Sequence, residues 1–155
     1  MSELDHAFYF SKEPYVPWSS TRPDVPISLI YLATPYSHKD KEVEKARFEI
    51  VTKVSAILTK HGYINFSPIT QSHEQSLRCD MPTNWHFWQH IDRCFLRKCD
   101  ELWVLSLPGW LESVGVTAEI EFAKSLNKTI RLITYREESD DIFFLNGTFE
   151  VEVLS

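Results

Sequence analysis

Two patterns of apolar residues alternate along the chain, and each predicts a different kind of secondary structure. Near-continuous apolar runs predict buried strands at 27–33, 63–68, 100–107 and 128–135. Between these runs, apolar residues recur at helical spacing and predict helices at about 40–61, 84–98 and 114–126. The segment 69–83 (ITQSHEQSLRCDMPT) follows neither pattern and is predicted to be a long loop.

Strands and helices that alternate in this order predict an α/β protein. We expect a single-domain three-layer α/β/α sandwich with a mostly parallel, Rossmann-like or flavodoxin-like sheet of four to five strands. Ligands of such folds bind outside the carboxyl ends of the strands. Those ends carry the segments ATPYS, SPITQSH and SLPGWLESVG, whose turn formers and small hydroxyl side chains suit a polar ligand.

The two ends of the chain depart from this central pattern. Residues 1–26 combine closely spaced prolines with aromatic residues, so we expect an extended arm that packs on its own domain or on a second subunit. Residues 27–155 are expected to form the α/β domain. After Tyr135, a polar stretch precedes a segment that is compatible with a hairpin around Asn146 and Gly147.

The composition is that of one globular domain, since 43% of the 155 residues are hydrophobic and 25% are charged. The net charge of -6 argues against a nucleic-acid polymer as partner but leaves a small nucleotide open. No apolar run approaches the roughly 18 residues of a membrane span, and the N-terminus lacks a signal-peptide pattern, so we expect a cytoplasmic protein. The cysteines show no C-x-x-C spacing and indicate reduced, structural thiols.

Two carboxylates fall on the apolar faces of predicted helices. At about 100° per residue, Glu119 lies within the apolar arc of the 114–126 helix. A buried carboxylate is costly unless it is paired or hydrogen-bonded, so each such acid is either a structural hydrogen-bonding group or part of a reactive site. Asp92 lies within the apolar arc of residues 85–99, and the same arc contains Trp85, Trp88, Ile91, Phe95, Leu96 and Cys99.

Taken together, the two acids suggest glycosyl transfer. Both lie on helices that flank the strand predicted at 100–107. Paired carboxylates near a cleft serve this chemistry, because one attacks or stabilises the anomeric carbon while the other moves protons. Glu119 also lies near the N-terminus of its helix, where the helix dipole favours the ionised form.

Four segments within residues 27–134 form an ordered set: IYLATPYS, SPITQSH, WQHIDRCFLRKCDELWVL and SVGVTAEIEFAKSLNKTIRLI. The last of them contains the pattern G-x-x-x-E-x-x-x-A around Glu119. Together these segments resemble the nucleoside 2-deoxyribosyltransferase superfamily, which includes deoxynucleoside and hydroxymethyl-pyrimidine 5′-monophosphate N-glycosidases.

The resemblance implies roles for three residues. Glu119 resembles the family nucleophile, which attacks C1′, displaces the base and holds a covalent deoxyribosyl intermediate. Asp92 resembles the carboxylate that assists the leaving base or orients the nucleophile. Tyr31, expected at a strand end, resembles the tyrosine that bonds the nucleophilic glutamate, and its alternative role is that of a packed strand aromatic.

Ser113 departs from the family members that act on free nucleosides, which carry aspartate at this position, and matches the monophosphate hydrolases. A serine hydroxyl and helix N-terminal N–H groups suit a phosphate, which an aspartate would repel. The alternative is that Ser113 only caps a helix. His73 is expected either to contact base or phosphate or to be a solvated loop residue. The further residues that we expect at the substrate are Gly115, Thr117, Ala33, Thr34, Ser37, His38, Ser67 and Pro68.

We therefore expect hydrolysis of the N-glycosidic bond of a (deoxy)nucleoside 5′-monophosphate. Base exchange between deoxynucleosides, or nucleotide binding without catalysis, are the alternatives. No cofactor or metal is expected, because His86 and His90 have metal-like spacing but no further ligand, and no phosphate-loop or dinucleotide fingerprint occurs. Relatives of this kind assemble as dimers or larger, so the resemblance implies a homo-oligomer.

Overall fold

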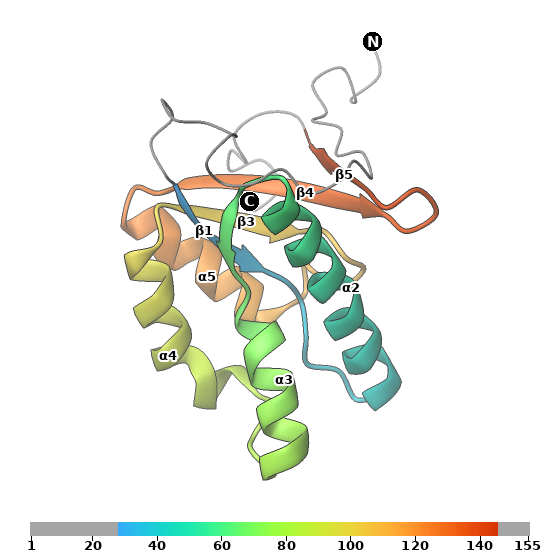
Figure 1. Ribbon diagram of the computed structural model, residues 1–155. Helices are drawn as coiled ribbons and strands as arrows, with labels where there is room; N and C mark the ends of the chain where they lie inside the picture. Colours follow the sequence, from blue (N-terminus) through green and yellow to red (C-terminus); the bar gives the residue numbers. More distant parts are fainter. Residues whose placement is uncertain (1–27, 146–155) are drawn as a thin grey trace.

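A computed structural model of the protein describes residues 28–145 (Figure 1). Within this range, one sheet is covered by four helices. The strands are β1 (Leu29–Ala33), β2 (Ile64–Phe66), β3 (Glu101–Leu105), β4 (Thr129–Arg136) and β5 (Asp141–Phe144). The helices are α2 (Lys41–Lys60), α3 (Pro68–Cys79), α4 (Trp85–Lys98) and α5 (Val114–Ser125).

The sheet has the strand order β2-β1-β3-β4-β5. Strands β1 to β4 are parallel, whereas β5 pairs antiparallel with β4. This is the order of flavodoxin-like sheets, in which ligands bind where the chain switches direction across the sheet. Here that point lies between β1 and β3, because the chain moves from β1 to β2 on one side and returns to β3 on the other.

Both faces of the sheet are buried, which explains why the strands appear as near-continuous apolar runs. Tyr31 and Ala33 point to a core that includes residues of α4 and α5, whereas Ile30 and Leu32 point to a core that includes residues of α2. Figure 1 shows α4 and α5 together on one face and α2 on the other. The predicted three-layer α/β/α architecture with a mostly parallel sheet is confirmed.

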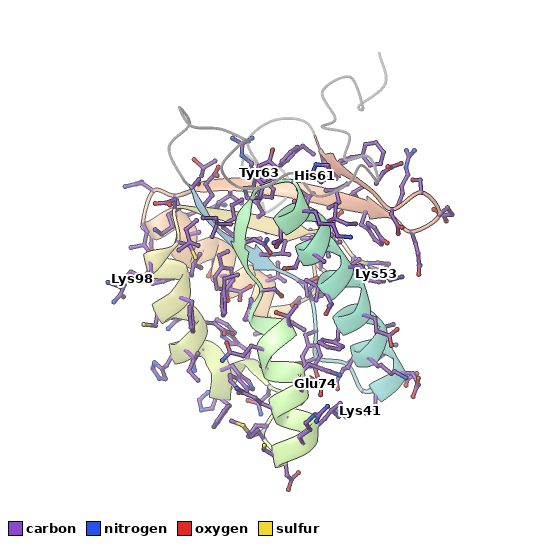
Figure 2. All side chains as sticks on the ribbon, viewed as in Figure 1. Lys41, Lys53, His61, Tyr63, Glu74 and Lys98 are labelled. Carbon is purple, nitrogen blue, oxygen red and sulfur yellow. The ribbon has the colours of Figure 1, made fainter. Side chains whose placement is uncertain are left out.

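The parallel strands all point to the same end of the molecule. In Figure 2, Lys41 at the beginning of α2 and Glu74 on α3 lie at this end, whereas His61 and Tyr63 lie at the opposite end. The loops that connect each strand to the following helix therefore gather near Lys41 and Glu74. None of the helices between residues 28 and 145 combines the length and apolar composition that crossing a membrane requires.

The prediction of a long loop at 69–83 is wrong, because most of this segment forms helix α3. Ser67 caps the helix by accepting a hydrogen bond from the Thr70 N–H, and Pro68 occupies its first turn. The helix lacks an apolar stripe because its buried residues are mainly polar, while Leu77 is 67% exposed. A pattern of large apolar residues at helical spacing therefore could not reveal it. The inward-facing residues are Pro68, Ser72, His73 and Ser76.

Two smaller expectations also differ from the structure. Tyr31 lies in the middle of β1 rather than at its end. Ile91 and Phe95, expected in the apolar core, are 43% and 39% exposed on α4. The polar stretch after Tyr135 contains the turn between β4 and β5. The arm expected at 1–26 lies outside the described residues. Of the segment expected to form a hairpin, 141–155, the structure describes only 141–145, where β5 pairs with β4, and the turn expected at Asn146 and Gly147 lies outside the described residues.

Candidate functional site

A cavity of about 460 Å³ lies at the carboxyl ends of β1 and β3, where the strand order predicts a ligand. Its volume is within the range of small-molecule sites, roughly 300–1,000 Å³. The loop after β1, the beginning of α3, the region around the start of α4 and the beginning of α5 all contribute to its walls. The lining residues are Thr34, Tyr36, Ser37, Ile69, Ser72, Thr83, Asn84, Trp85, His86, Trp88, Asp92, Glu112, Ser113, Val114, Gly115 and Glu119.

Glu119 points from α5 into this cavity and is only 5% exposed. The Tyr31 hydroxyl, which comes from β1, donates a 2.6 Å hydrogen bond to Glu119 Oε1. Burial raises the pKa of Glu119 to about 8, the hydrogen bond from Tyr31 lowers it, and the charge of Asp92 raises it. Burial and the charge of Glu119 raise the pKa of Tyr31 well above its usual value, so Tyr31 acts as a hydrogen-bond donor.

Asp92 reaches the same cavity from α4 and is 8% exposed. Its carboxylate has no hydrogen bond or ion pair with any side chain or backbone group between residues 28 and 145. Burial raises the pKa of Asp92 to about 7. Since the two carboxyl groups also repel each other electrostatically, the pair of Glu119 and Asp92 retains a proton near neutral pH.

The N-terminus of α5 forms another part of the cavity wall. Ser113 is the N-cap, because its Oγ accepts a 3.3 Å hydrogen bond from the Val116 N–H. The first intrahelical bond runs from the Thr117 N–H to the Ser113 carbonyl, so the N–H groups of Val114 and Gly115 precede the helical ladder. Donors at this place attract anions, and the Ser113 hydroxyl hydrogen adds a further donor.

The structure brings together about half of the residues expected at the site. Glu119, Asp92, Thr34, Ser37, Ser113 and Gly115 line the cavity, and Tyr31 contacts it through Glu119. Thr34 is 6% exposed, and its hydroxyl oxygen has no partner in the described chain, so it is available for a polar ligand group.

The other expected residues are not among those that line the cavity. Ala33 belongs to the apolar core, Ser67 and Pro68 begin α3, and the Thr117 amide bonds to the Ser113 carbonyl. His38 accepts a hydrogen bond from the Asp40 N–H at the start of α2. Each of these residues therefore supports the backbone near the site.

His73 is neither a solvated loop residue nor a lining residue. It is 4% exposed within α3, its Nδ1 lies 2.6 Å from the Tyr36 hydroxyl, and its ring stacks on Phe48 at 4.1 Å. Tyr36 does line the cavity. His73 therefore acts on the site only through Tyr36.

Two tryptophans of the cavity wall had been expected in the apolar core. Trp85 and Trp88 lie on the same side of α4 as Asp92, and Trp85 packs near Gly115 of α5. The Trp88 indole N–H donates to the Pro82 carbonyl at 2.6 Å. Their spacing from Asp92, seven and four residues, already placed them on the same face of the helix as that carboxylate, but it did not reveal that this face lines a cavity. Flat apolar walls of this kind suit a heterocyclic base.

Loop residues of the cavity wall carried no comparable signal. Thr83 and Asn84 precede α4, and Glu112 precedes the cap of α5. Their position beside Asp92 and Ser113 depends on how the helices pack. Sequence spacing alone does not reveal it.

The chain matches one protein family, whose description names no activity. Residues 28–135 match the family described as "Domain of unknown function (DUF1937)". No curated protein shows significant similarity to the chain. The matched segment runs from the start of β1 into β4 and contains Tyr31, Asp92, Ser113 and Glu119.

Proposed function

The chain belongs to the DUF1937 family, whose description states no activity, and from the site we propose that the protein hydrolyses the N-glycosidic bond of a (deoxy)nucleoside 5′-monophosphate. One observation carries the proposal: two buried carboxylates, Glu119 and Asp92, face one cavity, and of the two only Glu119 receives a hydrogen bond from a group in the described part of the chain. This asymmetry suits a pair in which one acid attacks and the other transfers a proton.

In the proposed first step, a Glu119 carboxylate oxygen attacks C1′ of the sugar. The bond between C1′ and the base nitrogen breaks, and the base leaves with the bonding electron pair and takes a proton from Asp92. In the second step, water attacks C1′, releases Glu119 and gives its proton to Asp92. The products are the free base and the sugar phosphate, and both carboxyl groups return to their initial states.

The contacts of the two acids support these roles. A hydrogen bond from Tyr31 stabilises the ionised form of Glu119 and fixes the direction of its carboxylate. Asp92 has no such donor between residues 28 and 145, and burial raises its pKa to about 7. In the ligand-free site the pKa of Glu119, about 8, is higher than that of Asp92, about 7. We therefore propose that the proton moves to Asp92 when substrate is bound, which makes Asp92 the acid for the leaving base.

The start of α5 supports a phosphate at the 5′ end of the substrate. Ser113, Val114 and Gly115 line the cavity, and the first turn of α5 contains no acidic residue. An anion placed there would interact favourably with the helix dipole. The walls formed by Trp85 and Trp88 would then contact the base.

A different observation favours a second candidate, base exchange on free nucleosides. Among the described residues, no lysine or arginine lines the cavity, and Glu112 lies directly beside Ser113. A neutral 5′-hydroxyl group would need no positive side chain, whereas a phosphate gains much of its affinity from one. The two candidates share Glu119 chemistry and differ in the 5′ group and in the acceptor.

The test is incubation with nucleosides and their 5′-monophosphates, including modified pyrimidines, followed by chromatography for released base. Release from a monophosphate with formation of free sugar phosphate supports hydrolysis. A new nucleoside, formed when a second free base is supplied, supports base exchange. Nucleotide binding without base release across the whole panel would contradict both activities. In either active case, Glu119→Gln should abolish release while the protein remains folded.

A further inference from the structure

Arg47 of α2 links two loops that are far apart in the sequence. Its Nη1 donates hydrogen bonds to the carbonyl oxygens of Tyr36 at 3.1 Å and Ser37 at 3.2 Å. Its Nη2 donates to the carbonyl oxygen of Pro108 at 3.1 Å. One guanidinium group therefore joins the loop after β1 to the loop after β3.

These two loops carry different parts of the cavity wall. The loop after β1 contributes Thr34, Tyr36 and Ser37, whereas the loop after β3 ends in Glu112 and Ser113. Arg47 itself is not a lining residue of the cavity. It lies in a second groove, between α2 and the loop after β3, so it contacts the loops from outside the substrate cavity.

Stability alone gives a poor account of this arrangement. Arg47 is partly buried and forms no ion pair with an acidic residue in the described part of the chain. Burial lowers its pKa, and the charge of Glu44 only partly opposes this effect. A partly desolvated cation that is satisfied by carbonyl groups costs free energy that an apolar side chain would not cost.

The neighbouring backbone is adapted to the guanidinium group. Gly109 has a φ of 91°, and a Cβ atom at this position would lie 2.7 Å from Arg47 Nη2. Any side chain here would strain the backbone and displace the guanidinium group. The glycine therefore permits the close approach on which the link to Pro108 depends.

Short hydrogen-bonded turns connect the anchored carbonyls to the cavity wall. The Trp110 N–H donates to the Leu107 carbonyl at 3.0 Å, and the Ser113 N–H donates to the Trp110 carbonyl at 3.4 Å. On the other side, the Ser37 hydroxyl donates to the Thr83 carbonyl at 2.7 Å. Movement at Pro108 or Ser37 would thus be transmitted to Ser113 or to the start of α4.

We propose that Arg47 is a positioning residue that holds the loop after β1 and the loop after β3 at a fixed separation and so sets the width of the substrate cavity. Its effect on catalysis rests on the proposed function, whereas its effect on the loops does not. Tyr31, Asp92 and Glu119 lie on β1, α4 and α5 rather than on the linked loops. Arg47 therefore acts on substrate binding more than on the chemical step.

The first experiment measures amide hydrogen exchange in the ligand-free protein. Arg47→Lys keeps the charge but cannot donate to both loops in the same way, so we expect at least about tenfold faster exchange in segments 36–39 and 109–112. Gly109→Ala places a Cβ atom against the Arg47 guanidinium group and so disturbs its hydrogen bond to Pro108. We expect faster exchange in the same two segments. Arg78→Lys, at an exposed arginine paired with Glu74, is the matched control and should leave both segments unchanged.

The second experiment measures base release by the same variants. We expect Arg47→Lys to raise KM about tenfold while kcat stays within about threefold. Unchanged exchange in either loop, equal acceleration throughout the chain, or a fall in kcat at constant KM would each overturn the proposal. If the wild-type protein releases no base from any substrate, the proposed function fails, and the exchange measurements alone decide whether Arg47 links the loops.

Discussion

Helices α2 and α5 begin at the same edge of the sheet, after β1 and β3, but their N-terminal turns differ in charge. Helix α2 is capped by Asp40 and carries Glu42 and Glu44 in its first turn. Helix α5 is capped by the neutral Ser113 and has no acidic residue in its first turn. The dipole of α2 is thus compensated by its own side chains, whereas that of α5 remains available to a ligand.

Each helix also buries a glutamate, and the partners of the two acids differ. Glu44, 4% exposed, accepts hydrogen bonds from Lys41 at 2.8 Å and from the His38 N–H at 3.0 Å. Glu119, 5% exposed, accepts one from the Tyr31 hydroxyl. A buried carboxylate with a cation and an amide as partners stabilises a helix start. A buried carboxylate whose partner is a single neutral donor and whose pKa is raised, such as Glu119, is suited to a role in catalysis.

Exchanging each buried glutamate for glutamine should give the largest contrast. Glu119→Gln removes the proposed nucleophile but preserves its shape, so we expect base release to fall by about 10⁴-fold or more while the melting temperature is maintained. Glu44→Gln should leave turnover unchanged but lower the free energy of unfolding by about 1–2 kcal/mol, because it weakens charged hydrogen bonds. Steady-state kinetics and thermal unfolding measure both. Equal losses of activity would remove the distinction between the two acids.

The next largest effect is expected for Asp92→Asn, which removes the proposed proton donor. We expect kcat to fall by about 10²-fold. Since the charge of Asp92 raises the pKa of Glu119, the rising limb of the pH–rate profile should also move to lower pH. Tyr31→Phe removes a hydrogen bond that lowers the pKa of Glu119, so it should move the same limb to higher pH. Shifts in the same direction for both variants would contradict the assigned interactions.

Making the start of α5 resemble that of α2 should alter substrate preference. Ser113→Asp keeps a good N-cap but adds a negative charge, so we expect KM for a 5′-monophosphate to rise about tenfold and KM for the free nucleoside to change little. The reciprocal control, Asp40→Ser on α2, should leave both KM values unchanged. Competition between a nucleoside and its monophosphate measures the preference. Equal effects on the two substrates would indicate that Ser113 does not contact phosphate.

The last contrast concerns the pH dependence of stability rather than turnover. The pKa of Glu119 is raised from 4.5 to about 8 on folding, so in this range the folded protein binds more protons than the unfolded chain. Raising the pH therefore favours unfolding, and the free energy of unfolding should fall between about pH 4.5 and 8. Glu119→Gln should flatten this slope, as measured by denaturant unfolding. A wild-type stability that rises through the same range would contradict the burial of this acid.

Regular apolar patterns allowed most of the fold to be predicted from the sequence. The strands are apolar on both faces and α2, α4 and α5 have an apolar side, so their spacing indicated each element to within a few residues. Helix α3 was not predicted, because it buries Ser72, His73 and Ser76 rather than large apolar side chains. A pattern of large apolar residues identifies a helix only when its buried face is apolar.

For the candidate site, the sequence by itself determined that Glu119 and Asp92 point inward, because the direction of a helical side chain depends on neighbours within one or two turns. Tertiary structure alone decided which groups these acids meet. Tyr31 and Glu119 are 88 residues apart, and Arg47 and Pro108 are 61 apart. Contacts over such separations depend on how the helices pack against the sheet, and no local pattern records that packing.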